Sequence, residues 1–171
     1  MDPVSEVDEL LQSLRGVWDE EAVDELDHAL QAAARARDDG ADDELVLAAA
    51  LHDLAHSPLL GPVSDDRHDR VAQLWLTPRF GSRVGWLAGA HVVAKRYLAA
   101  TDPRYAATLS TTSVCSLEHQ GGPGLDLDFV THPWRDDALR LRRYDDAAKD
   151  PYASGMTIED VLAVAARLAQ A

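Results

Sequence analysis

A short polar run, His52-Asp53 with His56 one helical turn later, stands at the end of an apolar segment, residues 45–54. Exposed polar groups are not expected on such a segment. Adjacent His and Asp side chains can serve two metal ions, because the imidazole binds one ion and the two carboxylate oxygens can bind both. The run therefore indicates a metal site, although the pair alone has low specificity.

Further candidate ligands recur along the chain, mostly flanked by apolar residues. They are His28, His68, His91 and Asp145. One or two polar groups per helix is how a helical bundle builds an interior metal site. Each has a structural alternative: a hydrogen-bonded core histidine, a solvated His68, or an Asp145 paired with Arg142 or Lys149. Together, six nitrogen and oxygen ligands without a thiolate favour iron or manganese over structural zinc.

Helices must position these ligands, because apolar residues recur at three- and four-residue spacing over nearly the whole chain. The predicted helices are residues 7–14, 20–37, 44–54, 66–76, 83–99, 105–118, 136–149 and 157–169. Pro78 and Pro103 are among the predicted stops, and Asp42 and Thr157 are predicted N-caps. No segment alternates with period two over the length of a strand, so we expect an all-α fold.

Length and composition predict one globular domain. The 171 residues can bury a sizeable core, and 46% hydrophobic with 27% charged residues excludes a disordered chain. No repeat or linker is present, so the expected domain covers residues 1–171. Its motifs lie within residues 18–149, and an amphipathic helix follows at 157–169. The sequence is compatible with a monomer or a homodimer.

The net charge of −14 bears on the possible partners. With 30 acidic and 16 basic side chains, the surface repels phosphate backbones, so we expect no nucleic-acid partner. No apolar run approaches the roughly 18 residues that span a bilayer, and the start lacks a signal-peptide pattern. The single cysteine, Cys115, indicates a reducing, cytoplasmic location. A small anionic substrate would need local positive charge.

Longer motifs place the ligands in a family context. The order His28, His52-Asp53, His68, His91, Asp145 resembles the HD-domain superfamily in its dinuclear form. The segments HVVAKRYL (91–98), QGGP (120–123) and LRRYDDAAK (141–149) are narrower. They resemble the superfamily's branch of mixed-valent diiron oxygenases, which includes the 2-amino-1-hydroxyethylphosphonate dioxygenases.

The resemblance implies a helical HD domain that holds two Fe ions, in the Fe(II)/Fe(III) state, and uses O2 as co-substrate. It implies that one iron is held by His28, His52, Asp53 and Asp145, and the other by Asp53, His68 and His91. Asp53 would then bridge the two ions. His52, Asp53 and Lys95 would be the catalytic residues.

The resemblance also implies a site for a small phosphonate. Its residues would be His56, Lys95, Ser113, Ser116 and Arg142. Lys95 shares a face with His91 if helix 83–99 is continuous, and Arg142 is three residues before Asp145. Two cations, two hydroxyls and an imidazole suit a dianion. Ser116 stands where the family usually has Thr. Without the resemblance, both cations would be interpreted as surface residues.

Two further positions, Glu21 and Trp18, concern the part of the substrate beyond the phosphonate group. Glu21 matches the family's mobile carboxylate that meets a substrate ammonium, although it could be an ordinary first-turn helix acid. Trp18 is the gate position, where several members carry a Tyr that caps an iron before substrate arrives. An indole N–H is a donor only and cannot ligate iron. Trp18 thus predicts a different gate or a different substrate.

Three functions are compatible with these residues. The first is O2-dependent oxidation of a small 1-hydroxyphosphonate, with C–P cleavage to phosphate and a carboxylic acid. The second is an HD-type metal-dependent phosphohydrolase acting on a small phosphate ester or nucleotide, since the same cations can bind phosphate. The third is a non-catalytic binding protein with a structural metal. The narrow motifs favour the first.

Overall fold

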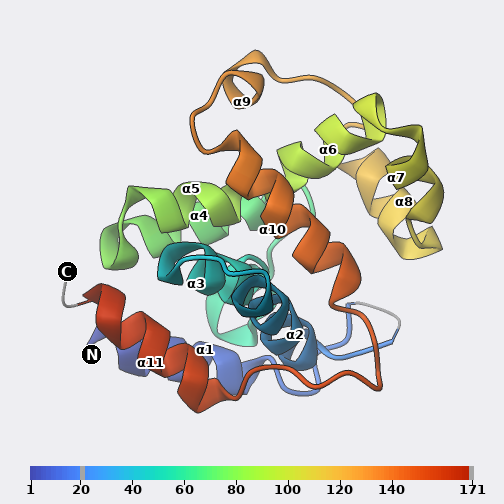
Figure 1. Cartoon of the computed structure of the whole chain (residues 1–171). Coiled ribbons are helices and arrows are strands. Elements are labelled where there is room, and N and C mark those ends of the chain that lie inside the picture. Colours follow the sequence, from blue (N-terminus) through green and yellow to red (C-terminus); the bar gives the residue numbers. More distant parts are fainter. Residues whose placement is uncertain (20–21, 170–171) are drawn as a thin grey trace.

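The computed structural model describes residues 1–19 and 22–169 and shows an all-α architecture (Figure 1). No β-strand forms within these residues, which confirms the predicted fold class. None of the described helices is both long and apolar enough to cross a membrane. The α-helices are α1 (Pro3–Ser13), α2 (Glu25–Asp38), α3 (Asp43–Leu51), α4 (His68–Phe80), α5 (Ser82–Gly89), α6 (His91–Thr101), α7 (Pro103–Thr108), α8 (Thr111–His119), α9 (Leu127–Val130), α10 (Arg135–Ala147) and α11 (Ile158–Ala169).

The short helix α3 lies in the middle of the molecule (Figure 1). Every side chain from residue 45 to residue 51 is buried. Helices α2, α5, α10 and α11 all contact α3, and the first helix, α1, packs against the last, α11. A helix that is apolar on all sides is stable only when it is surrounded in this way.

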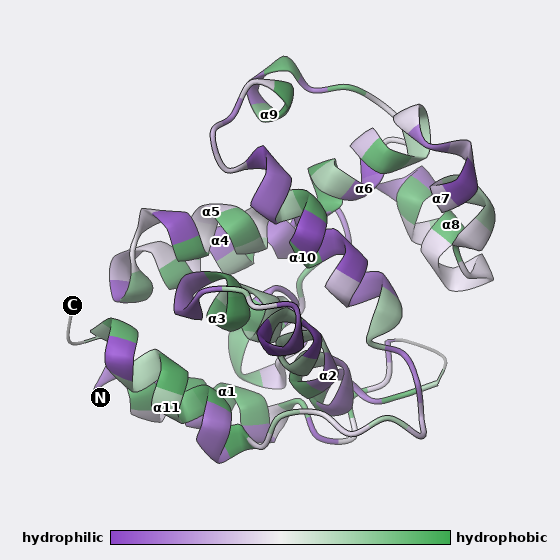
Figure 2. Ribbon diagram, in the orientation of Figure 1, coloured by the Kyte–Doolittle hydropathy of each residue, from purple (hydrophilic) through white to green (hydrophobic). Residues whose placement is uncertain are grey.

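Helix α10 is largely hydrophilic, although it packs against α2, α3, α5 and α6 (Figure 2). Buried charged side chains explain this contradiction: Arg142 and Asp145 are 4% and 3% exposed. Buried charges are stable only when they are paired or bind an ion. The polar interior of the fold therefore lies between α10 and the central helices.

Both predicted N-caps, Asp42 and Thr157, are confirmed. Asp42 Oδ1 accepts the Leu45 N–H at 2.9 Å at the start of α3. The Thr157 N–H donates to Asp160 Oδ2 at 3.2 Å, and the Asp160 N–H donates to Thr157 Oγ1 at 3.1 Å. This reciprocal arrangement satisfies amide donors that have no partner inside the helix.

The prediction of one helix over residues 83–99 is wrong. The chain forms α5 and α6, with a break at Ala90. The break coincides with a side-chain contact, because His91 Nδ1 donates to the Ala88 carbonyl at 2.6 Å. His91 and Lys95 still lie one turn apart, since both belong to α6.

Other predicted boundaries also shift. Residues 105–118 form two helices, α7 and α8, because Ser110 caps α8 by accepting the Ser113 N–H at 3.1 Å. Helix α2 begins at Glu25 rather than residue 20, with Asp24 accepting the Asp27 N–H at 2.9 Å as its N-cap. Helix α9 was not predicted.

Pro78 does not end its helix, contrary to prediction, because α4 continues to Phe80. Proline removes one hydrogen bond to the carbonyl four residues earlier. That residue is Leu74, whose side chain is 59% exposed, so water can hydrate the carbonyl. Pro103 is confirmed as a stop: α6 ends at Thr101, and Pro103 opens α7.

Candidate metal and anion-binding site

Two of the candidate ligand histidines are fixed by carbonyl groups at helix ends. His52 is the C-cap of α3, and its Nδ1 donates to the Ala49 carbonyl at 2.8 Å. His91 follows the end of α5 and donates in the same way to the Ala88 carbonyl. The last carbonyls of a helix have no partner within the helix, so they are free to hold these rings.

The other two candidate ligand histidines are held by a carbonyl at the end of another helix and by a carbonyl in the turn before α4. His28 Nδ1 donates at 2.9 Å to the carbonyl of Ala148, the C-cap of α10, and His68 Nδ1 donates to the Asp65 carbonyl at 2.7 Å. A carbonyl oxygen can only accept, so Nδ1 carries the proton in all four rings. In its neutral form each ring therefore presents the lone pair of Nε2, as a metal ligand must.

These Nε2 atoms face one another in two pairs. His28 Nε2 lies 3.3 Å from His52 Nε2, and His68 Nε2 lies 2.8 Å from His91 Nε2. Two lone pairs at these distances repel unless a proton or a metal ion lies between them. The geometry of the donor atoms therefore fits metal ions at both pairs.

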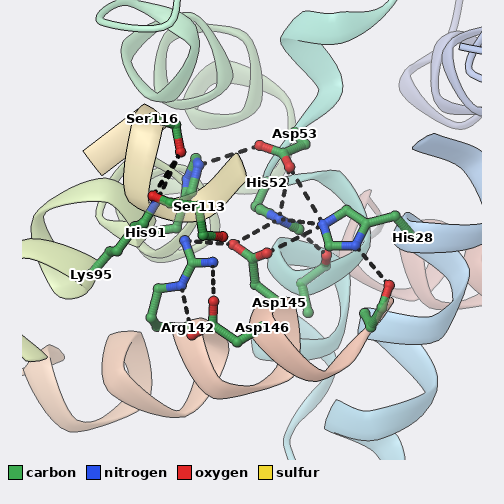
Figure 3. A network of polar contacts seen from close by, with 12 residues as sticks. His28, His52, Asp53, His91, Lys95, Ser113, Ser116, Arg142, Asp145 and Asp146 are labelled. Carbon is green, nitrogen blue, oxygen red and sulfur yellow. Dashed lines mark hydrogen bonds and ion pairs between the residues drawn. The ribbon is translucent and has the colours of Figure 1, made fainter. Parts of the chain in front are cut away.

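Asp53 lies within reach of both pairs, and Figure 3 shows its carboxylate with His28, His52 and His91. Its Oδ2 is 3.2 Å from His52 Nε2 and 3.5 Å from His28 Nε2. Its Oδ1 is 3.3 Å from His91 Nε2 and 3.5 Å from His68 Nε2. One carboxylate oxygen thus faces each histidine pair, which is the arrangement a bridging ligand needs.

Asp145 completes the first group of donors. Its Oδ1 is 3.3 Å from His28 Nε2, and its Oδ2 is 3.2 Å from His52 Nε2. The structure therefore brings all six predicted metal ligands together. We call this set, His28, His52, Asp53, His68, His91 and Asp145, the metal end of the site.

Charges at the metal end favour a bound cation. Burial lowers the pKa of His52, but the carboxylates of Asp53 and Asp145 outweigh it and raise that pKa to about 10. Burial raises the pKa values of the two carboxyl groups, yet the nearby cations and hydrogen bonds hold both well below their usual range. The two carboxylates thus remain ionised and attract positive charge, which metal ions would supply.

A cavity of about 190 Å³ opens beside the metal end. Lys95, on α6, reaches it with only 3% of its surface exposed and donates to Ser116 Oγ at 2.8 Å. Ser113 and Ser116, both on α8, line the cavity with Arg142 (Figure 3). We call Lys95, Ser113, Ser116 and Arg142 the anion end of the site.

The alternative that Lys95 and Arg142 are surface cations is wrong, because both are buried. Arg142 Nη1 lies 2.8 Å from Asp145 Oδ2, and its Nη2 and Nε donate to Asp146 at 2.6 and 3.2 Å. Arg142 is thus fixed by two carboxylates and joins the metal end to the anion end. Burial, and next the charge of Arg142, lower the pKa of Lys95 to about 8.

The remaining predicted residues lie in different places. His56 lines the cavity, with its Nε2 3.9 Å from Asp53 Oδ1 and 3.7 Å from Asp19 Oδ2. Trp18 is 65% exposed and is not part of the cavity wall. Glu21 lies outside the residues that the structure describes.

Sequence reasoning missed Asp146 and Glu25. The signal for Asp146 was its spacing of four residues from Arg142. Glu25 is 1% exposed, and its carboxyl oxygens have no hydrogen-bond partner within the described part of the chain. Burial and the nearby Asp53 raise its pKa to about 9. Its position one turn before His28 on α2 could have indicated that it lies near the metal end.

Comparison with known proteins gives these features a context. No family model matches the chain. It is 35% identical over 170 residues, 92% of this chain and 82% of the relative, to hydroxymethylphosphonate dioxygenase of Gimesia maris. It is 33% identical over 139 residues, 75% of this chain and 70% of the relative, to [1-hydroxy-2-(trimethylamino)ethyl]phosphonate dioxygenase (glycine-betaine-forming) of Leisingera caerulea. Because both relatives match over most of their length, the chain belongs to the hydroxyphosphonate dioxygenase family.

Proposed function

We propose that this protein is a diiron oxygenase that uses O2 to cleave the C–P bond of a small 1-hydroxyphosphonate, giving phosphate and a carboxylic acid. One observation carries the proposal. Two pairs of facing Nε2 atoms share Asp53, and a buried lysine and arginine line the cavity that opens beside them. The names of the two relatives support both the reaction and the substrate class.

The donor set suits iron. We assign one ion to His28, His52, Asp53 and Asp145, and the other to Asp53, His68 and His91. Imidazole and carboxylate ligands without thiolate favour iron over structural zinc, and the resemblance implies the Fe(II)/Fe(III) state. When bound, the iron would supply the redox chemistry that O2 reduction requires.

The anion end would bind and orient the phosphonate group. Asp145 and Asp146 offset the charge of Arg142, so Lys95 is the cation at this end whose charge is least compensated. A bound dianion would raise the lowered pKa of Lys95 and hold its ammonium in the charged form. Ser113 would donate its hydroxyl proton to a phosphonate oxygen, Ser116 would do the same once it releases the Ser113 carbonyl, and His56 would donate from the metal side. Together these groups overcome the repulsion expected from a chain of net charge −14.

The proposed reaction balances without a further reductant. A 1-hydroxyphosphonic acid and O2 together contain the atoms of one carboxylic acid and one phosphoric acid. The hydroxyl-bearing carbon loses four electrons as its C–H and C–P bonds break, and O2 accepts four. We therefore expect one O2 consumed per phosphate released.

We further propose that residues 1–171 form one HD domain. The last helix, α11, contacts α1, α2, α3 and α4, so the segment beyond the motifs packs on the same core as the ligands.

The test is O2 uptake and phosphate release by the iron-loaded protein. The candidate substrates are hydroxymethylphosphonate, 2-amino-1-hydroxyethylphosphonate and its trimethylammonium analogue. We expect equal O2 uptake and phosphate release with at least one of them, and no release without O2. Anaerobic release of phosphate from nucleotides or aryl phosphates, with no O2 uptake on any phosphonate, would overturn the proposal in favour of a phosphohydrolase.

A further inference from the structure

The chain contains two lysines, Lys95 and Lys149, among its 16 basic residues. Both donate to serine hydroxyls on α8. Lys95 Nζ lies 2.8 Å from Ser116 Oγ, and Lys149 Nζ lies 3.3 Å from Ser113 Oγ. The two serines are three residues apart, so their side chains lie on the same face of the helix. Lys149 thus contacts Ser113 as Lys95 contacts Ser116, but it follows the end of α10 whereas Lys95 belongs to α6.

Lys149 reaches Ser113 from a second cavity. Tyr105, Ser110, Arg143 and Lys149 line this cavity, which has a volume of about 460 Å³. Ser113 lines both cavities and is 5% exposed. Ser113 therefore lies between Lys149 and the proposed phosphonate position.

The segment that carries Lys149 is fixed at the metal end. The carbonyl of the preceding residue, Ala148, accepts the proton of His28 Nδ1 at 2.9 Å. Four residues before Lys149, Asp145 faces the same histidine. The position of Lys149 is therefore coupled to the geometry of the metal ligands.

The two serine hydroxyls differ in where their protons go. An ammonium has no lone pair, so Ser113 and Ser116 both accept from their lysines. Ser116 Oγ donates its own proton to the Ser113 carbonyl at 3.2 Å. Within the described part of the chain, Ser113 Oγ makes only the bond to Lys149, so its proton is available. A hydroxyl that accepts from an ammonium is also a stronger donor, because hydrogen bonds in a chain polarise one another.

We propose that Lys149 is a positioning residue for the substrate: it holds Ser113 so that the Ser113 O–H donates to a phosphonate oxygen. The identity of the anion rests on the proposed function, but the contact itself does not. Lys149 touches neither the reacting carbon nor the metal ligands. Its loss should therefore weaken binding of the anion and leave the chemical step unchanged.

The experiment measures binding of methylphosphonate, which lacks the reactive hydroxyl, and of inorganic phosphate to the iron-loaded protein by calorimetry. Lys149→Met should weaken both by about tenfold, the effect of one charge-assisted hydrogen bond. Lys149→Arg should restore binding to within about threefold of the unmodified protein, because the positive donor is retained. Arg143→Gln is the matched control, since Arg143 lines the second cavity but pairs with Asp102 at 3.9 Å.

A double-mutant cycle separates this role from a general structural one. Ser113→Ala should remove the effect of Lys149→Met, so that the double variant binds phosphate no more weakly than Ser113→Ala alone. In turnover, Lys149→Met should raise KM by about tenfold with kcat within about twofold. Additive losses, or unchanged binding in Lys149→Met, would overturn the inference. Iron content and circular dichroism establish that each variant is folded, and Lys149→Gln provides a second neutral replacement.

The two proposals can fail separately. Phosphate binding that depends on Lys149 in a protein that consumes no O2 would uphold this inference and reject the oxygenase. O2-dependent turnover with no contribution from Lys149 would do the reverse.

Discussion

The anion end lines the cavity that opens beside the metal end, but the two ends are held in different ways. At the metal end, backbone carbonyls fix the ring of each of the four histidines, as the Ala49 carbonyl fixes His52. At the anion end, side chains hold side chains: Lys95 donates to Ser116, and Arg142 is paired with Asp145 and Asp146. The rings of the metal end are therefore positioned by the backbone, whereas the anion end depends on contacts between side chains.

This difference separates the expected effects of substitutions. Substituting a metal-binding side chain that the backbone positions should abolish turnover. Removing a group that binds through a flexible side chain should change mainly affinity, because the metal ligands stay in place. The following predictions test that separation.

The largest effect is expected at the metal end. His52→Ala removes a candidate iron ligand whose side chain is fully buried. Iron content should therefore fall, and turnover should drop by more than about a thousandfold. Iron per protein and O2 uptake measure both effects. His132→Ala is the control, because His132 stacks on Trp86 with ring centroids 3.7 Å apart, away from the metal ligands. Full iron content and turnover in His52→Ala would contradict the assignment.

A smaller and different effect is expected at the anion end. Lys95→Met removes a charge-assisted contact, so KM should rise by about 10- to 100-fold. Iron content should remain unchanged, and kcat should fall much less than in His52→Ala. Steady-state kinetics with iron analysis test this, and Arg167→Met, which removes an exposed cation paired with Asp43, is the control. Loss of iron in Lys95→Met would mean that the two ends are not separable.

The pH dependence provides a finer test of the anion end. The pKa of Lys95 is lowered to about 8, so its ammonium is present below that pH and is lost as the pH rises through it. Because kcat/KM reports the free enzyme, it should decline above pH 8 by about tenfold per pH unit. Lys95→Arg, which stays charged, should move this decline to higher pH. If kcat/KM of the Lys95→Arg variant declined over the same pH range, another group would be responsible for the decline.

The last prediction concerns stability rather than turnover and involves Glu25, whose carboxyl oxygens have no hydrogen-bond partner within the described residues. Its pKa is about 9 in the folded protein and 4.5 in the ordinary carboxyl group, so the folded state binds more protons between these values. Stability of the metal-free protein should therefore fall as the pH rises from 4.5 through 9. Glu25→Gln should reduce that fall while leaving melting near pH 5 almost unchanged. Melting temperatures of the unmodified protein and of Glu25→Gln, measured across this pH range, test the prediction. If the two proteins showed the same dependence on pH, Glu25 would not be responsible for the fall.

Helix periodicity was sufficient for the all-α fold, because buried helices leave apolar residues at regular spacing. It was not sufficient for helix ends, as α5 and α6 show. The break at Ala90 arises where His91 takes the Ala88 carbonyl, and no local pattern at Gly89 or Ala90 indicates that contact. Capping was predicted correctly at Asp42 and Thr157, whereas the equally local caps Asp24 and Ser110 were missed.

The sequence by itself determined which residue types are present for metal and anion binding, and in what order they occur. Only the tertiary structure decided that His28 faces His52, that His68 faces His91, and that Asp53 lies between the pairs. The tertiary structure also brought Lys149 to Ser113. The physical reason is distance along the chain: these contacts join helices that are many residues apart, so packing of the whole core sets them. The spacing of residues along the sequence does not determine these contacts.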